Sequence, residues 1–130
     1  MRMTLAAAAT ATAALIATQA IASEPFGIWQ TKSDDNGAYL LVEVLPCETD
    51  EAKLCSRVTE VINSPHQEIV GRPIFWDMVT EDGKNWDRGR VWDALTNEEY
   101  DAKVILGKTA LRVEGCVGIL CDGQNWKRPE

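Results

Sequence analysis

Short runs in which apolar and polar residues alternate make up most of the chain after residue 23. The clearest runs are 100–106 and 111–117, where every second residue, starting from Tyr100 and from Leu111, is apolar or small. A period of two residues is typical of an antiparallel strand with one buried face. The pattern therefore predicts two strands here and places Val117 on the same face as Leu111.

The other predicted strands are shorter or less regular, and turn residues separate them. They are expected at 26–32, 38–45, 54–62, 88–95 and 124–128. The run 38–45 is apolar on both faces except at Glu43, which predicts a central, covered strand. Turns are predicted at 34–37 and at Asp122-Gly123, because Asp, Asn and Gly favour turn conformations.

The segment from His66 to Thr80 is harder to interpret. Gly71-Arg72-Pro73 argues against a central strand, because proline cannot donate a hydrogen bond to a ladder. The apolar residues in 74–79 are compatible with a short strand or with a single turn of helix. Seven or eight short strands without crossover helices predict an all-β fold, either an antiparallel barrel or a sandwich.

The first 22 residues have the composition of a signal peptide. A basic start at Arg2 is followed by an uncharged run rich in Ala, Leu, Ile and Thr, which ends in Ala20-Ile21-Ala22. Signal peptidases accept such a small-x-small ending. A membrane anchor is the less favoured alternative, because the run is short and no stop-transfer charges follow it. We expect a signal peptide at 1–22, cleaved near Ala22, and a single periplasmic or secreted domain at 23–130.

All four cysteines lie in the predicted mature domain: Cys47, Cys55, Cys116 and Cys121. An even number of cysteines in an exported chain predicts disulfides. Three pairings are possible, and Cys47–Cys55 with Cys116–Cys121 is favoured because each pair flanks a short turn-like segment. A zinc site is disfavoured, since the spacings differ from those of zinc modules and the chain has one histidine.

The negative net charge limits the kinds of molecule that the protein is expected to bind. The chain has 13 basic and 20 acidic residues and a formal net charge of −7, and it loses Arg2 with the leader. Such a surface repels phosphate backbones and anionic lipids, so neither nucleic-acid binding nor stable membrane insertion after cleavage is expected. No nucleophile–base pair can be assigned around His66, so we do not expect an enzyme. We also expect a monomer that needs no metal or cofactor.

The five tryptophans are the most informative candidate functional residues. Large rings either fill the core of a small barrel or line a pocket for an apolar or sugar-like ligand, and some do both. If the barrel is hollow, its predicted lining is Tyr39, Trp76, Trp86, Arg90, Trp92 and Tyr100. If the first and last strands are neighbours, Arg128 is expected to stack on the Trp29 ring; the alternative is a solvated Arg128.

Several motifs occur in an order that spans the predicted mature domain. They are Gly27-x-Trp29, Gly71-Arg72-Pro73-Ile74, Trp86-Asp87-x-Gly89-x-Val91-x-Asp93, Tyr100-x-Ala102-Lys103-Val104, Leu111-x-Val113-x-Gly115-Cys116-Val117-Gly118 and Trp126-Lys127-Arg128. Together they resemble the bacterial family catalogued as domain of unknown function 2147. The resemblance implies a small exported, lipocalin-like β-barrel and no established activity.

The chain departs from the family pattern at three places. The family usually has Pro and Gly in the turn after the last Asp of its Trp-Asp block, and here Asn97 is expected to take the role of the Gly. An Arg often precedes the Gly-Cys pair, where this chain has Glu114. If that Arg contacts an anionic ligand in relatives, this chain has lost the contact. Cys47 and Cys55 look like an addition to the family pattern.

Two functions of different classes follow from these observations. The leading hypothesis is a binding protein that holds a small apolar or amphipathic molecule in an aromatic-lined barrel, because a barrel of eight strands is wide enough for one small ligand. The alternative is a periplasmic protein-interaction, enzyme-inhibitor or envelope-stress module that presents the loops 48–53 and 63–73 to a partner. A filled barrel interior counts against the first hypothesis.

Overall fold

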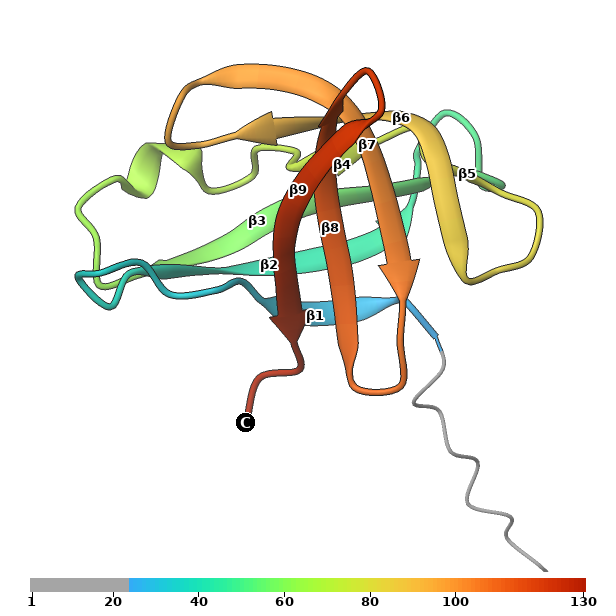
Figure 1. Ribbon diagram of the computed structural model, residues 1–130. Coiled ribbons are helices and arrows are strands. Elements are labelled where there is room, and N and C mark those ends of the chain that lie inside the picture. Colours follow the sequence, from blue (N-terminus) through green and yellow to red (C-terminus); the bar gives the residue numbers. More distant parts are fainter. Residues whose placement is uncertain (1–23) are drawn as a thin grey trace, which may run out of the picture.

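The structure, a computed structural model that describes residues 24–130, consists of antiparallel strands wrapped around one interior (Figure 1). The strands are β1 (Gly27–Gln30), β2 (Tyr39–Pro46), β3 (Leu54–Ile62), β4 (Phe75–Trp76), β5 (Val79–Thr80), β6 (Asn85–Asp93), β7 (Glu98–Leu106), β8 (Ala110–Val117) and β9 (Leu120–Lys127). Their order around the wall is β3-β2-β1-β9-β8-β7-β6-β4, and β5 pairs with β6. The predicted all-β antiparallel barrel is confirmed, whereas the predicted signal peptide at 1–22 lies outside the described residues.

The first and last strands of the described chain meet in the middle of the sheet. β1 and β9 are antiparallel neighbours, with Gln30 opposite Lys127. β2 lies between β1 and β3, as its apolar character predicts, and buries Val42 and Val44. Within residues 24–130, no helix is long and apolar enough to cross a membrane.

The ambiguous segment 66–80 contains three very short elements. Gln67–Ile69 form one turn of 3-10 helix, η2, and the apolar residues beyond Pro73 form β4 and β5 rather than a helix. Both strands pair with β6, but Asp77 between them has a φ of 57°, which breaks the run. The short-strand interpretation of 74–79 is therefore the correct one.

The β8–β9 turn differs from the prediction. Asp122-Gly123 does not turn the chain; it lies inside β9, where Gly123 faces Glu114. The reversal occurs earlier, at Gly118, because Cys116 pairs with Cys121 and leaves two residues for the hairpin loop between Val117 and Leu120. This hairpin extends past the barrel wall, so Val117 is exposed although the period of its strand predicted burial.

The interior is filled by one cluster of buried apolar side chains. Phe75 and Trp126 stack within it at a centroid distance of 5.8 Å. The cluster consists of Trp29, Val42, Val44, Leu54, Val58, Val61, Ile74, Phe75, Met78, Trp86, Val91, Trp92, Ala102, Val104, Leu106, Leu111, Val113 and Trp126. The tryptophans of this cluster thus act largely as core residues.

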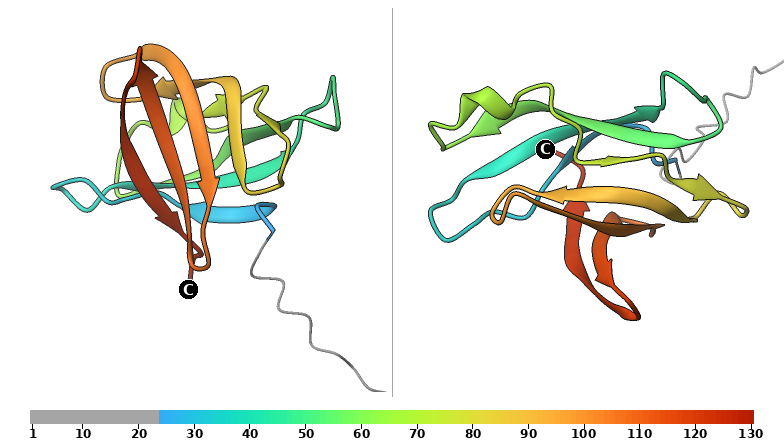
Figure 2. Two further views of the ribbon diagram at one scale, coloured as in Figure 1. Left: turned by 45° about the vertical axis from the view of Figure 1, so that its right-hand side comes forward. Right: turned by 90° about the horizontal axis from the view of Figure 1, so that it is seen from above.

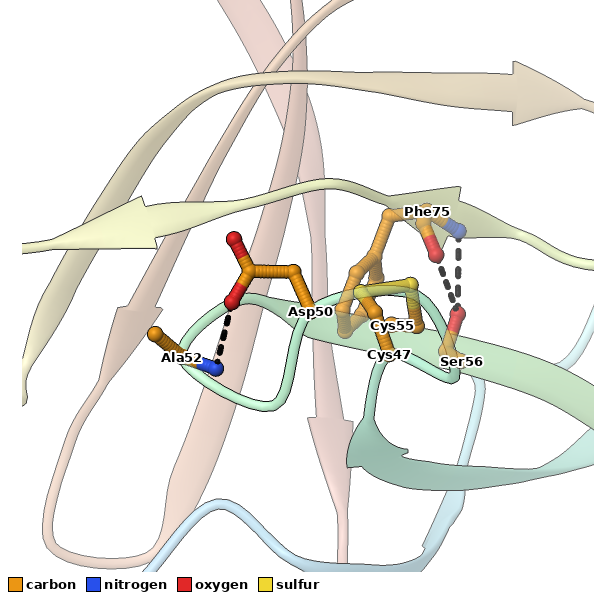
Figure 3. Close-up of a disulfide and its surroundings, with 6 residues drawn as sticks. All are labelled: Cys47, Asp50, Ala52, Cys55, Ser56 and Phe75. Carbon is orange, nitrogen blue, oxygen red and sulfur yellow. Dashed lines mark hydrogen bonds between the residues drawn. A yellow bond between two sulfur atoms is a disulfide. The ribbon is translucent and has the colours of Figure 1, made fainter.

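The barrel closes along a seam between β3 and the segment 71–78. Leu54 and Met78 exchange two backbone hydrogen bonds of 2.9 and 3.0 Å, and the Val58 backbone bonds to Gly71 and Arg72. Between these points a side chain, and not the backbone of β3, makes the hydrogen bonds to β4. The buried Ser56 hydroxyl accepts a hydrogen bond from the Phe75 N–H at 2.9 Å and donates one to the Phe75 carbonyl at 3.2 Å (Figure 3).

Replacing Ser56 by alanine is expected to lower the free energy of unfolding by about 2 kcal/mol. The reason is that it leaves the buried N–H and C=O of Phe75 without their partner. Urea denaturation of the purified domain measures the change, and Ser33→Ala at an exposed position serves as the control, with a change below about 0.5 kcal/mol. Equal denaturation midpoints for the Ser56→Ala and Ser33→Ala proteins would show that the seam does not depend on this hydroxyl.

Candidate functional site

An open hollow lies at one end of the barrel. The right-hand view of Figure 2 places the start of β1, the β2–β3 loop and the β5–β6 turn at this end. The hollow has a volume of about 300 Å³, is open to solvent and has mostly apolar walls. Its lining is Glu24, Pro25, Phe26, Glu51, Ala52, Lys53, Leu54, Thr80, Gly83 and Trp86.

The loop between β2 and β3 forms one wall and is held at its base. Cys47 and Cys55 form a disulfide across the loop, which confirms the first predicted pairing (Figure 3). Asp50 shapes the tip, because its Oδ1 accepts a hydrogen bond of 3.0 Å from the Ala52 N–H. The backbone of Lys53 bonds to both Asp50 and Cys47. A loop fixed in this way presents a preformed surface to a ligand.

The β5–β6 turn forms another wall and is ordered by one carboxylate. Oδ1 of Asp82 accepts hydrogen bonds of 2.8 Å from the N–H groups of Lys84 and Asn85, and Oδ2 accepts one of 2.9 Å from Nδ2 of Asn85. These bonds, led by the Asn85 side chain, hold the pKa of Asp82 well below its usual range. The Asp82 carboxylate therefore stays charged, and the turn that it orders stays intact, at neutral and mildly acidic pH.

A bulge in β6 separates Trp86 from the residues that follow it. Trp86 pairs with Val104 and Gly89 pairs with Ala102, so β6 has one more residue than β7 between these points. Arg88, inside the bulge, has a φ of 63°. An extra residue reverses which face the following side chains occupy. Trp86 points inward and is 5% exposed.

Two of the other predicted lining residues, Arg90 and Trp92, lie on the far side of the bulge and are out of phase with Trp86. Arg90 pairs with Asp101 in register, and its Nη1 lies 2.7 Å from Oδ1 of that carboxylate in an exposed ion pair. Trp92 is 6% exposed and belongs to the buried core cluster, and the Arg72 guanidinium lies 3.7 Å from its ring centroid. Its Nε1 donates a hydrogen bond of 2.9 Å to Asn97.

The remaining predicted lining residues lie apart from the hollow. Tyr100 and Trp76 pack partly buried against the core cluster, and the Tyr100 hydroxyl donates a 3.0 Å hydrogen bond to Glu98. Tyr39 is half-buried at the start of β2, opposite Ile62. The structure thus brings Trp86, and none of the other five, to the walls of the hollow.

Trp29 and Arg128 anchor the segment that forms the third wall. The Arg128 guanidinium stacks on the Trp29 ring at 3.8 Å, as predicted from the closure of the barrel. Its two terminal nitrogens donate to the carbonyls of Ile28 and Glu24, at 3.1 and 2.9 Å. Trp29 Nε1 donates to the carbonyl of Pro25 at 2.7 Å. Both residues therefore hold the backbone of the segment Glu24–Phe26 in place, and partial burial lowers the pKa of Arg128.

Most of the residues that line the hollow were not predicted, because they come from three segments that are distant in sequence. Phe26 is a half-exposed aromatic residue beside the first strand, and Ala52 and Thr80 carry no chemical signal of their own. A partial signal existed in the Cys47–Cys55 pair, which indicates that the intervening loop is constrained.

Cys47, Cys55 and Asp77 lie close enough together to resemble a metal site. The two cysteines are oxidised to a disulfide, and thiolate rather than disulfide sulfur is the metal ligand. The second predicted disulfide, Cys116–Cys121, is also present. His66 is exposed, with its Nδ1 3.3 Å from Glu68.

The fold and the sequence were compared with known proteins. A search of curated proteins gives no match. Among solved structures, protein HP1028 from Helicobacter pylori is similar, with a TM-score of 0.64 and 15% identity over 82% of this chain and 84% of that chain. It is described as belonging to the lipocalin family, and at this identity the likeness shows a shared lipocalin-like fold. A family described as "Uncharacterized protein conserved in bacteria (DUF2147)" matches residues 27–128. The chain therefore belongs to the DUF2147 family, as its motifs predicted.

Proposed function

We propose that this protein is an exported binding protein, not an enzyme, that holds a small apolar molecule in the hollow at the end of the barrel. The observation that carries the proposal is the mostly apolar hollow of about 300 Å³ with Trp86 in its wall. Two disulfides in a small bacterial protein support export. The lipocalin-like fold supports ligand binding as a class of function.

The size and charge of the hollow define the ligand. Ligand pockets start at about 300 Å³, so the hollow suits a small molecule of a few rings or a short alkyl chain and is too small for a large hydrophobic molecule. Glu24 and Glu51 flank it, against one basic residue, Lys53. An uncharged apolar molecule, or one with an amine, is therefore favoured over a carboxylate. This site differs from the predicted one, because the ligand lies at the barrel end and not in the filled interior.

Binding of the neutral fluorophore N-phenyl-1-naphthylamine is expected to raise its emission, and 1-octanol is expected to displace it. Octanoate, which has the same chain length and a negative charge, is expected to compete at least about tenfold more weakly, since two carboxylates border the hollow. Fluorescence titration of the purified mature protein measures all three affinities.

A matched pair of tryptophan substitutions locates the binding. Ala52→Trp fills the hollow and is expected to weaken binding at least about tenfold, whereas Ala94→Trp adds the same ring to an exposed turn at the other end. Equal affinities for these two variants, or no binding of either probe at millimolar concentration, would contradict the proposal. The alternative in which loops 48–53 and 63–73 bind a protein partner stays a prediction.

A further inference from the structure

The tip of the β8–β9 hairpin exposes three aliphatic side chains. Val117 is 68% exposed, Ile119 is 96% exposed and Leu120 is 75% exposed. The hairpin projects beyond the neighbouring strands, as the right-hand view of Figure 2 shows. Isolated exposed apolar residues are common, but three within four positions at the end of a projecting hairpin form a patch that marks an interaction site.

The hairpin tip, defined as residues 117–120, is also rigid. The Cys116–Cys121 disulfide joins the two strands at its base, with the Cα atoms 4.1 Å apart. Gly118 has a φ of 63°, which suits the first position of a two-residue hairpin turn. Because the tip has little conformational freedom to lose, ordering on binding costs it little.

The charges around the tip indicate the chemistry of a partner. From Val113 to Trp126 the sequence contains two carboxylates, Glu114 and Asp122, and no basic residue. Arg112 neutralises Glu114 through a 2.6 Å contact, and Asp122 is exposed beside the disulfide. The tip is thus apolar, with the exposed carboxylate of Asp122 at its base. The formal net charge of −7 disfavours both a second copy of the chain and an anionic lipid surface as the partner.

We propose that the hairpin tip docks into a partner protein through an apolar pocket whose rim carries Lys or Arg side chains. Ile119 is the central side chain of the contact, Val117 and Leu120 flank it, and Asp122 faces the basic rim. This surface lies apart from the ligand hollow and from loops 48–53 and 63–73, so the inference does not depend on the proposed ligand.

Site-specific crosslinking in the producing bacterium tests the inference. A diazirine amino acid replaces Ile119 in the full chain and, in a control, Leu95, which is 88% exposed at the tip of a different hairpin. We expect a protein adduct from position 119 that is absent from position 95 and is abolished by Leu120→Asp. Mass spectrometry is expected to place the crosslink in an apolar pocket with Lys or Arg within the same surface. A lipid adduct, a dimer of this chain, or equal yields from both positions would overturn the inference.

Affinity measurements with the purified crosslinked partner complete the test. Ile119→Asp is expected to weaken binding about 30-fold or more, because it removes a buried aliphatic side chain and places a charge in the pocket. Leu95→Asp is expected to change the affinity less than about twofold. Association is expected to slow several-fold as salt is raised, since opposite charges steer the encounter. Equal affinities for Ile119→Asp and Leu95→Asp would exclude the hairpin tip as the docking element.

Discussion

Gly89→Ala is expected to destabilise the folded protein by about 3 kcal/mol, the upper part of the range for overpacked sites. A methyl group at this position would collide with the backbone carbonyl oxygen of Trp76 and would lie 2.5 Å from Sδ of Met78. The carbonyl carbon of Asp77 would lie 3.0 Å away. Two of these three atoms belong to the backbone that crosses from β4 to β5, so a rotamer change cannot relieve the collision.

Chemical denaturation followed by circular dichroism measures the loss of stability of the Gly89→Ala protein, and Gly107→Ala is the control. A methyl group at Gly107 would meet one atom, the Ala110 carbonyl oxygen, at 3.3 Å. We expect the control to lose about 1 kcal/mol or less. If Gly89→Ala unfolded at the same denaturant concentration as the unsubstituted protein, the close passage of residues 76–78 over β6 would be wrong.

Trp29→Ala is expected to have the second large effect, a loss of about 4 kcal/mol of stability. The substitution opens a cavity in the core, removes the hydrogen bond to Pro25 and leaves Arg128 without the ring on which it stacks. Leu95→Ala, at an exposed position, is the control and is expected to change stability by less than about 0.5 kcal/mol.

A double-mutant cycle separates the stacking of Arg128 from the rest of the Trp29 effect. Arg128→Met keeps most of the aliphatic stem and removes the guanidinium. We expect a coupling energy of about 1 kcal/mol between Trp29→Ala and Arg128→Met, as for a partly shielded cation–π pair. Strictly additive effects of the two substitutions would show that the stacked geometry contributes no energy of its own.

The strands and disulfides were predictable because they rest on local signals. The two-residue period identified β7 and most of β8, and short cysteine spacings favoured the two observed pairings. Asn97, which was expected to replace a glycine, has a φ of 57°. The adjacency of β1 and β9 followed from barrel closure and correctly placed Arg128 over Trp29.

The candidate site was less predictable, for two physical reasons. The bulge at Arg88 shifts the phase of β6, and nothing in the alternation of Trp86, Arg90 and Trp92 reveals an extra residue. These three even-numbered positions therefore seemed to share one face, although Trp86 lines the hollow and the other two do not. The hollow itself depends on how distant loops pack together, which a linear pattern does not encode.

The seam closed by Ser56 is joined by few hydrogen bonds, so the barrel wall can open there. Six of the seven neighbouring strand pairs in the wall share at least two registered residues, and β1 and β9 share one. β3 and β4 are the two ends of the strand order and are joined by a few bonds. Local opening is favoured where backbone bonding is sparse, as it is at this seam and between β1 and β9. Opening of the seam exposes the backbone N–H and C=O groups along the edge of β3. Such an unpaired edge can pair with a strand of another chain. The Ser56 hydroxyl, together with the backbone bonds at Leu54 and Val58, thus keeps the edge of β3 covered.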